Sequence, residues 1–155
     1  MNQEGFELFF KTHYVAAARF ACAQVGAAQA EDAVQDAFIR FYRHRHSLDG
    51  VRNLEAYFFR ILYNVCLSLL RRRGIWARVL DLLRREPSPV QVPKGHDLQD
   101  VWFTLSPSEK AVLVLVEYQG WDDAAAAEAL GMQPATLRVH RFRLREKIRN
   151  WEAGS

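Results

Sequence analysis

A proline-rich stretch near the middle of the chain limits what the whole sequence can fold into. Residues 86–95 contain three prolines and one glycine. Proline lacks a backbone donor and clashes with the preceding turn of a helix, so neither a helix nor a central strand accepts such a run. We therefore expect two small modules within the 155 residues. The N-terminal module spans residues 1–74, a linker spans residues 75–96, and the C-terminal module spans residues 97–155.

Apolar residues recur at helical spacing through the N-terminal module, and this pattern predicts three helices. The first spans residues 6–25 and the second residues 29–45. Asn53 is a good N-cap for a third helix over residues 54–73. The third helix is apolar on nearly every side, so it belongs at the centre of a helical bundle. Gly74 directly follows three arginines and is the expected stop signal of that helix.

The C-terminal module is predicted to hold four shorter helices. The first spans residues 97–105, and Ser106, followed by a proline and a nearby glutamate, marks the start of the next. A third helix over residues 123–130 ends at a glycine, and the last spans residues 134–151. A short helix, a turn and a longer basic helix form the order of a helix-turn-helix. The expected fold class is all-α: two small helical domains joined by a proline-rich linker, the C-terminal one a helix-turn-helix.

Positive charge is concentrated in the last predicted helix. The whole chain carries a net charge of only +3. Residues 134–150 hold six basic side chains and one acidic one, whereas residues 99–133 hold one lysine and six acidic side chains. A basic segment beside an acidic one is the local footprint of a surface that binds a polyanion.

A helix-turn-helix predicts that the polyanion is duplex DNA, because the second helix of this motif enters the major groove. Arginines there pair with guanine edges, apolar side chains contact thymine methyl groups, and other cations bind phosphates. Arg138 and Arg143 are the candidates for guanine contacts, and Phe142 is the candidate for a thymine methyl. The full set of candidate contact residues on this helix is Thr136, Arg138, Val139, Phe142, Arg143 and Arg145.

Several other classes of protein are disfavoured by the sequence. Cys22 and Cys66 are too few for a disulfide framework and lie in apolar segments, where buried thiols are expected. The usual glycine-rich phosphate loop, nucleophile elbow and zinc-protease motif are missing, so we expect no enzyme activity, no cofactor and no metal. No segment approaches the about 20 apolar residues of a membrane helix, and the N-terminus lacks a secretory signal. We expect a cytoplasmic protein without membrane insertion.

Three segments also carry a resemblance to a known family. Residues 30–38 read Ala-Glu-Asp-Ala-Val-Gln-Asp-Ala-Phe, which is similar to a family pattern Ala-Glu-Asp-x-x-Gln-Glu-x-Phe. Residues 53–64 are similar to the pattern Asn-x-x-Ala-Trp/Tyr-Leu-x-Arg-Ile-Ala-x-Asn, and residues 130–145 are similar to a DNA-reading helix of the same family. In this order and with the proline-rich gap between them, the segments resemble sigma factors of the extracytoplasmic-function (ECF) class, which are initiation factors of bacterial RNA polymerase.

The resemblance implies partners and binding residues for the N-terminal module. The residues that would bind core RNA polymerase are Asp32, Gln35, Asp36, Phe38 and Arg40. The residues that would capture the non-template strand of the minus-ten promoter element are Asn53, Tyr57, Arg60, Asn64, Arg71, Arg72 and Arg73. The C-terminal helix-turn-helix would read the minus-thirty-five element as duplex DNA. The resemblance also implies an anti-sigma partner that inhibits the factor.

Two other hypotheses remain open from the sequence. A stand-alone helix-turn-helix regulator would have to dimerise in order to read two half-sites about one helical turn apart. The sequence offers no heptad seam for such a dimer, and we expect a monomer when the chain is free. A small helical enzyme or adaptor would show no salt-dependent binding to DNA.

Overall fold

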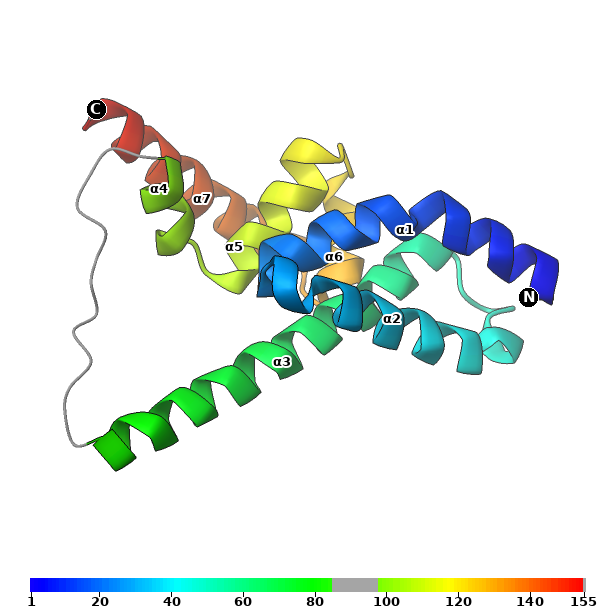
Figure 1. Ribbon diagram of the computed structural model, residues 1–155. Coiled ribbons are helices and arrows are strands. Elements are labelled where there is room, and N and C mark those ends of the chain that lie inside the picture. Colours follow the sequence, from blue (N-terminus) through cyan, green and yellow to red (C-terminus); the bar gives the residue numbers. More distant parts are fainter. Residues whose placement is uncertain (85–97, 155) are drawn as a thin grey trace.

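A computed structural model describes residues 1–84 and 98–154 of the chain (Figure 1). Every regular element in these two ranges is helical, which confirms the all-α fold class. The proline-rich stretch lies outside the described residues. The elements are α1 (Gln3–Val25), α2 (Ala27–Arg43), the 3-10 turn η1 (Arg45–Ser47), α3 (Leu54–Arg84), α4 (Leu98–Thr104), α5 (Pro107–Val112), the π-helical turn η2 (Leu113–Tyr118), α6 (Asp123–Leu130) and α7 (Pro134–Ala153).

The N-terminal helices form a bundle in which α1 and α2 run antiparallel and α3 packs against both (Figure 1). The sharp turn between α1 and α2 needs Gly26, whose φ of 88° favours glycine. Asn53 caps α3 as expected, because its side-chain oxygen accepts a hydrogen bond from the backbone N–H of Ala56 at 3.0 Å. Aromatic side chains fill the centre, where the ring of Phe58 lies 4.3 Å from that of Phe38 and 5.6 Å from that of Phe41.

The predicted end of the third helix at Gly74 is wrong, because α3 continues to Arg84. Glycine ends a helix when it adopts a left-handed conformation. The glycines with positive φ among the described residues are Gly26, Gly120 and Gly131, and Gly74 is not one of them. A glycine inside a helix costs only about 1 kcal/mol relative to alanine. The strong helix formers that follow Gly74 outweigh this cost.

The C-terminal helices begin and end where their caps predict. Ser106 accepts a hydrogen bond from the backbone N–H of Glu109 at 3.1 Å, and Asp122 accepts one from Ala125 at 2.7 Å. Gly131 ends α6 in the left-handed conformation, with φ 66° and ψ 34°. On α7, Leu137 and Leu144 are fully buried and dock the helix.

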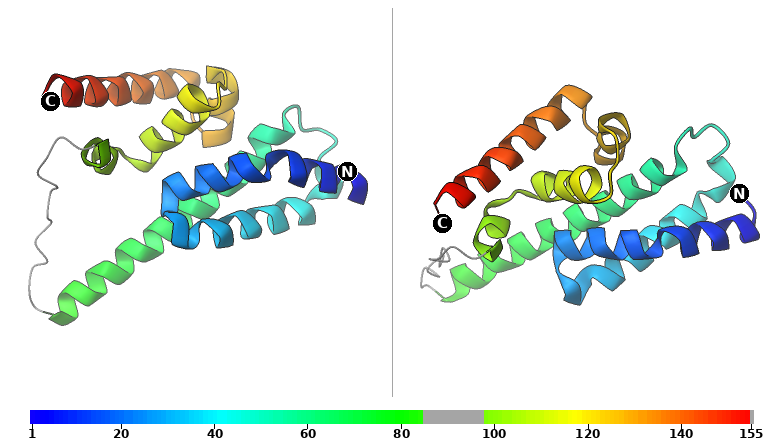
Figure 2. Two further views of the ribbon diagram at one scale, coloured as in Figure 1. Left: turned by 45° about the horizontal axis from the view of Figure 1, so that its top comes forward. Right: turned by 90° about the horizontal axis from the view of Figure 1, so that it is seen from above.

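The two groups of helices pack against each other around one continuous core (Figure 2). Helix α6 lies across α3, and α5 lies beside the end of α1. Buried alanines on α6, among them Ala126 and Ala129, leave room for this close approach. The ring of Trp121 meets that of Phe59 edge-on at 5.1 Å, and the hydroxyl oxygens of Tyr63 and Ser108 lie 3.1 Å apart. Helix α7 lies on the side of the C-terminal helices that faces away from α1, α2 and α3 (Figure 2).

Candidate nucleic-acid and protein interfaces

The first half of α7 presents the predicted DNA-contact residues to solvent. Arg138, Val139, Phe142 and Arg143 share one face because residues three and four apart are neighbours on a helix. The exposed fractions are 48% for Val139 and 63% for Phe142, although both side chains are apolar. Thr136 is exposed in the first turn of the same helix. Pro134 at the start and the buried leucines on the opposite side hold this face outward.

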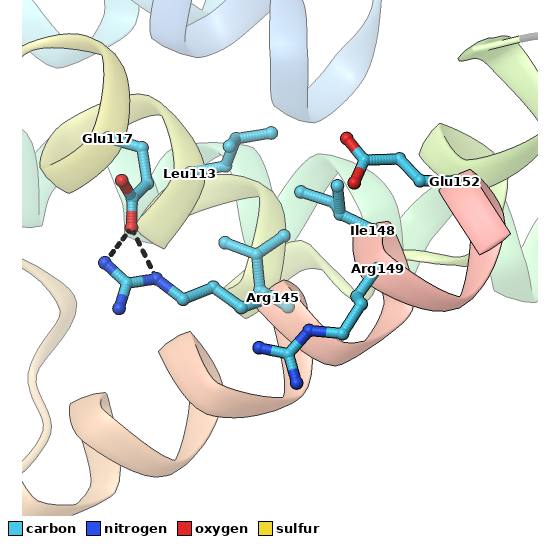
Figure 3. A pocket seen from close by; sticks show the side chains of 7 residues that line it. Leu113, Glu117, Arg145, Ile148, Arg149 and Glu152 are labelled. Atoms are coloured by element: carbon cyan, nitrogen blue, oxygen red, sulfur yellow. Dashed lines mark hydrogen bonds and ion pairs between the residues drawn. The ribbon is translucent and has the colours of Figure 1, made fainter.

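The arginines of α7 fall into two groups that the sequence did not distinguish. Arg145 forms an ion pair with Glu117 on η2 at 2.8 Å (Figure 3), and Arg141 forms one with Asp123 on α6 at 2.6 Å. Arg138 and Arg143 have no hydrogen-bonding or ion-pair partner among the side chains that the structure describes. On the predicted DNA-contact face, the guanidinium groups that remain available are therefore those of Arg138 and Arg143; Arg149, further along α7, is also unpaired among the described residues. Figure 3 shows Arg145 and Arg149 beside a hollow of about 390 Å³ between α7 and η2.

A third cation of α7 anchors the helix to the rest of the C-terminal module. Lys147 donates to the backbone oxygen of Thr104 at 2.8 Å and to the carboxylate of Glu109 at 2.9 Å. The side chain of Glu109 is only 7% exposed. Burial alone would raise the pKa of Glu109, but hydrogen bonds from Lys147 and Ser106, together with the charge of Lys147, outweigh it and hold that pKa below its ordinary value. Lys147 therefore ties α7 to both α4 and α5.

Replacing Lys147 with methionine should lower the free energy of unfolding by about 2 kcal/mol at neutral pH, because it leaves a buried carboxylate without its cation. The stabilisation from Glu109 is present above the ordinary glutamate pKa and is lost as the pH falls through its lowered value. The difference between Lys147→Met and the unaltered chain should therefore shrink in acid. Urea titrations at several pH values measure it. Lys11→Met, at an exposed lysine of α1, is the control and should change stability by less than about 0.5 kcal/mol. A difference that stays constant down to low pH would contradict the role of Glu109.

The predicted minus-ten residues lie in different environments along α3 and at its N-cap. Tyr57 is half-buried with its ring 6.2 Å from that of Phe41, and Asn53 is occupied as the helix cap. Arg60 is exposed but lies against the turn after α6, where a Cβ atom placed on Gly131 would be 3.3 Å from its Nη2. The remaining members, Asn64, Arg71, Arg72 and Arg73, are exposed to solvent.

Arg73 is the member of this set that serves the fold directly. Its Nη2 donates to the backbone oxygen of Val25 at 2.7 Å and also to the side chain of Gln29. Val25 is the last residue of α1, and its carbonyl lacks a partner within the helix. Arg73 thus caps the C-terminus of α1 from α3, which accounts for one cation of the three in a row.

The predicted polymerase-binding residues lie on α2. Asp32, Gln35 and Arg40 are exposed, and Arg40 pairs with Asp36 one turn earlier at 2.9 Å. Phe38 is only 3% exposed and belongs to the aromatic core. Beside this face lies a mainly apolar hollow of about 540 Å³, which sequence reasoning missed; its lining residues are Phe6, Phe10, Gln35, Phe38, Ile39, Tyr42 and Arg43.

The expectation of two buried thiols is wrong for Cys22, which is exposed. It lies beside the stripe of α1 that faces the bundle, whose nearest buried members are Phe20 and Ala21. Cys66 is buried, and burial raises the pKa of its thiol to about 12, so it stays protonated. Among the described residues no group of His, Cys, Asp and Glu side chains is arranged to hold a metal ion. No described helix is long and apolar enough to span a bilayer.

Comparisons with known proteins agree on one family. The family Sigma-70 region 2 matches residues 9–75. The ECF RNA polymerase sigma factor SigE of Mycolicibacterium smegmatis is 31% identical over 134 residues, which cover 80% of this chain and 52% of SigE. The ECF sigma factor SigM of Mycobacterium tuberculosis is 27% identical over 150 residues, which cover 95% of this chain and 76% of SigM. The chain therefore spans about half the length of SigE and about three quarters of SigM.

A solved structure extends the likeness to both groups of helices. The sigma factor RpoE of Bartonella quintana, determined in complex with the anti-sigma factor NepR, superposes with a TM-score of 0.77 at 25% sequence identity. The superposition covers 97% of this chain and 98% of RpoE. Sequence relatives and overall structure point in the same direction: residues 9–75 match the family Sigma-70 region 2, and the chain as a whole is similar to ECF-class RNA polymerase sigma factors.

Proposed function

We propose that the chain is a promoter-recognition subunit that directs core RNA polymerase to specific promoters and assists promoter opening. The N-terminal domain, residues 1–74, would bind the polymerase and the minus-ten element. The C-terminal domain, residues 97–155, would read the minus-thirty-five element through a helix-turn-helix formed by α6 and α7. The observation that carries this proposal is the exposed face of α7, where Arg138 and Arg143 have no partner among the described residues and lie beside the solvent-exposed Phe142.

The chemistry of that face fits the major groove of duplex DNA. An arginine that makes no ion pair within the protein keeps its full set of donors for the O6 and N7 atoms of guanine. Phe142 and Val139 are exposed apolar side chains between the two arginines and suit thymine methyl groups. Arg145 remains a proposed phosphate contact, because its pair with Glu117 is exposed and weak enough to exchange for a phosphate.

Replacing Arg138 or Arg143 with alanine should cost about 1–3 kcal/mol of promoter binding and relax sequence preference at one or two base pairs. Replacing Arg145 should weaken binding to every sequence alike and lower the salt dependence. The measurement is selection from a library of minus-thirty-five sequences by the chain assembled with core polymerase, followed by sequencing of the bound DNA. Equal, sequence-independent losses for all three variants would contradict the assignment.

On α2, the exposed charges suit a docking face for core polymerase. Asp32, Gln35, Asp36 and Arg40 form a polar strip, and the adjoining hollow offers apolar contact through Ile39, which is 51% exposed. We propose that Phe38 supports this face from beneath, since it is buried and its ring stacks at 4.3 Å on Phe58. An apolar centre beside charged side chains is the usual composition of a specific protein interface.

The packing of α6 on α3 suggests how the factor is held inactive. Arg60, a proposed minus-ten residue, lies under the turn at Gly131, so the two domains would have to separate before a promoter strand reached it. We propose that an anti-sigma partner stabilises this closed arrangement. RpoE, a structural relative with both groups of helices similarly arranged, was determined with such a partner.

Run-off transcription tests the proposed function directly. Core polymerase with the full-length chain should produce transcripts from a subset of native promoters, and core polymerase alone should not. A monomer by sedimentation that binds promoters only with core polymerase would favour the sigma-factor hypothesis. A dimer that binds DNA without polymerase would favour the stand-alone regulator. We propose no catalytic residue, cofactor or metal, and we place the activity in the cytoplasm.

A further inference from the structure

We propose that the C-terminal part of α3 binds the surface of an anionic lipid membrane. We call residues 71–83 the α3 extension. Figure 1 shows α3 projecting well past the ends of α1 and α2, and each of residues 71–79 and 81–83 is exposed. Apart from Arg73, which caps α1, the exposed side chains of the extension contribute little to the core and are available to another surface.

A contiguous apolar stripe runs along the extension. The exposed fractions of its large apolar side chains are 62% for Ile75, 63% for Trp76, 37% for Val79, 79% for Leu82 and 74% for Leu83. The spacings of three, four and seven residues put all five on one side of the helix. Isolated exposed apolar residues are ordinary on a protein surface, whereas a contiguous patch of this kind marks an interaction site.

Arginines lie beside the stripe, and their positive charge favours some possible partners over others. Arg71 and Arg78 border it, and Arg72 lies on the same side of the helix one turn before Trp76. Asp81 is the single acidic residue of the extension, and helical spacing places it on the opposite side. A helix with leucines and a tryptophan on one face, bordered by arginines, has the composition of helices that lie in the headgroup region of anionic bilayers.

Two other partners fit the same surface less well. A second copy of the chain would bring rows of arginines together. A stripe of nine residues is also only about 13 Å long, so two such stripes would bury much less than the roughly 1,200 Å² of a stable interface. Duplex DNA would satisfy the arginines but leave Leu82, Leu83 and Trp76 in water. A lipid surface satisfies the charged and the apolar groups together. Membrane binding and capture of the minus-ten strand would both use Arg71 and Arg72, so the two would compete.

The test is flotation of the full-length chain with vesicles. A two-to-one mixture of phosphatidylcholine and phosphatidylglycerol should bind the chain at least tenfold more strongly than phosphatidylcholine alone, and added salt should weaken binding. Binding should shift the fluorescence emission to shorter wavelength, and Trp76→Phe should abolish that shift. The double substitution Leu82→Glu with Leu83→Glu should reduce binding at least tenfold, while run-off transcription remains that of the unaltered chain.

Leu8→Glu is the matched control, because Leu8 is an equally exposed leucine, at 68%, on α1. It should leave vesicle binding unchanged. Equal binding by the double variant and the unaltered chain would overturn the proposal. The proposal would also be overturned if the unaltered chain formed a dimer that the double variant abolished, because a second copy would then cover the stripe. It would likewise be overturned if the double variant lost only DNA binding and the unaltered chain did not bind vesicles. None of these outcomes depends on whether the sigma-factor assignment is correct.

Discussion

Replacing Phe58 with alanine is expected to lower the free energy of unfolding by about 3–5 kcal/mol, which is the usual cost of removing a fully buried phenylalanine. The side chain of Phe58 is 0% exposed. Its ring meets that of Phe38 at 4.3 Å, that of Phe59 at 5.5 Å and that of Phe9 at 5.6 Å. The substitution would leave a cavity between all three N-terminal helices. Domains of this size are stable by only about 5–15 kcal/mol, so the variant should be close to unfolding at body temperature.

Urea denaturation followed by circular dichroism measures this loss. Phe10→Ala is the matched control, because Phe10 belongs to the same aromatic group but is 38% exposed at its edge. It should cost clearly less than Phe58→Ala, since less apolar surface returns to water. Equal losses at the two positions would mean that α3 is not the centre of the bundle.

Local signals in the sequence predicted most of the helix ends. Asn53, Ser106 and Gly131 act within one turn of their own position, so their effect is readable from the residues alone. Gly74 shows the limit of this reasoning. Whether a glycine ends a helix depends on the balance between its own conformation and the residues that follow, and three preceding arginines did not decide that balance.

The roles of single cations could not be predicted, because they depend on partners distant in the chain. Arg145 and Glu117 are 28 positions apart, and Arg73 is 48 positions from Val25. Composition showed that α7 is basic, but only the packing of α7 on η2 and α6 separates the paired arginines from Arg138 and Arg143. The same holds for Phe38, whose ring is buried although the next residue, Ile39, is 51% exposed.

The contact between the two groups of helices also could not be predicted from the sequence pattern. The alanines of α6 contribute little apolar area of their own. In the structure their small size lets α6 approach α3, and the missing area is supplied by Phe59 and Trp121 from outside the helix. Stability of the C-terminal module and its contact with the bundle are thus coupled, which leads to a prediction about Trp121.

Replacing Trp121 with alanine should cost about 3 kcal/mol, the lower end of the range for tryptophan, because the ring is half-buried. It should also uncouple the two halves. Trp121 joins α6 to α3 through Phe59. The other polar links between the two groups among the described residues are few: Tyr63 to Ser108, Gln24 to the backbone oxygen of Pro107 at 2.9 Å, and the guanidinium of Arg19 over the ring of Tyr118 at 5.8 Å. Hydrogen exchange should therefore show amides of α6 and α7 opening before those of α3, whereas in the unaltered chain they open together.

Trp102→Ala provides the comparison for this experiment. Trp102 is another half-buried tryptophan, but it lies on α4, where the ammonium of Lys110 is 5.0 Å from its ring, away from the contact with α3. Its loss should destabilise the C-terminal helices without separating their opening from that of α3. If closure restricts access to Arg60, Trp121→Ala should also raise transcription with core polymerase at limiting concentrations of the factor, because less free energy is needed to separate the domains. Unchanged exchange and unchanged transcription in Trp121→Ala would mean that the closed arrangement does not limit access to α3.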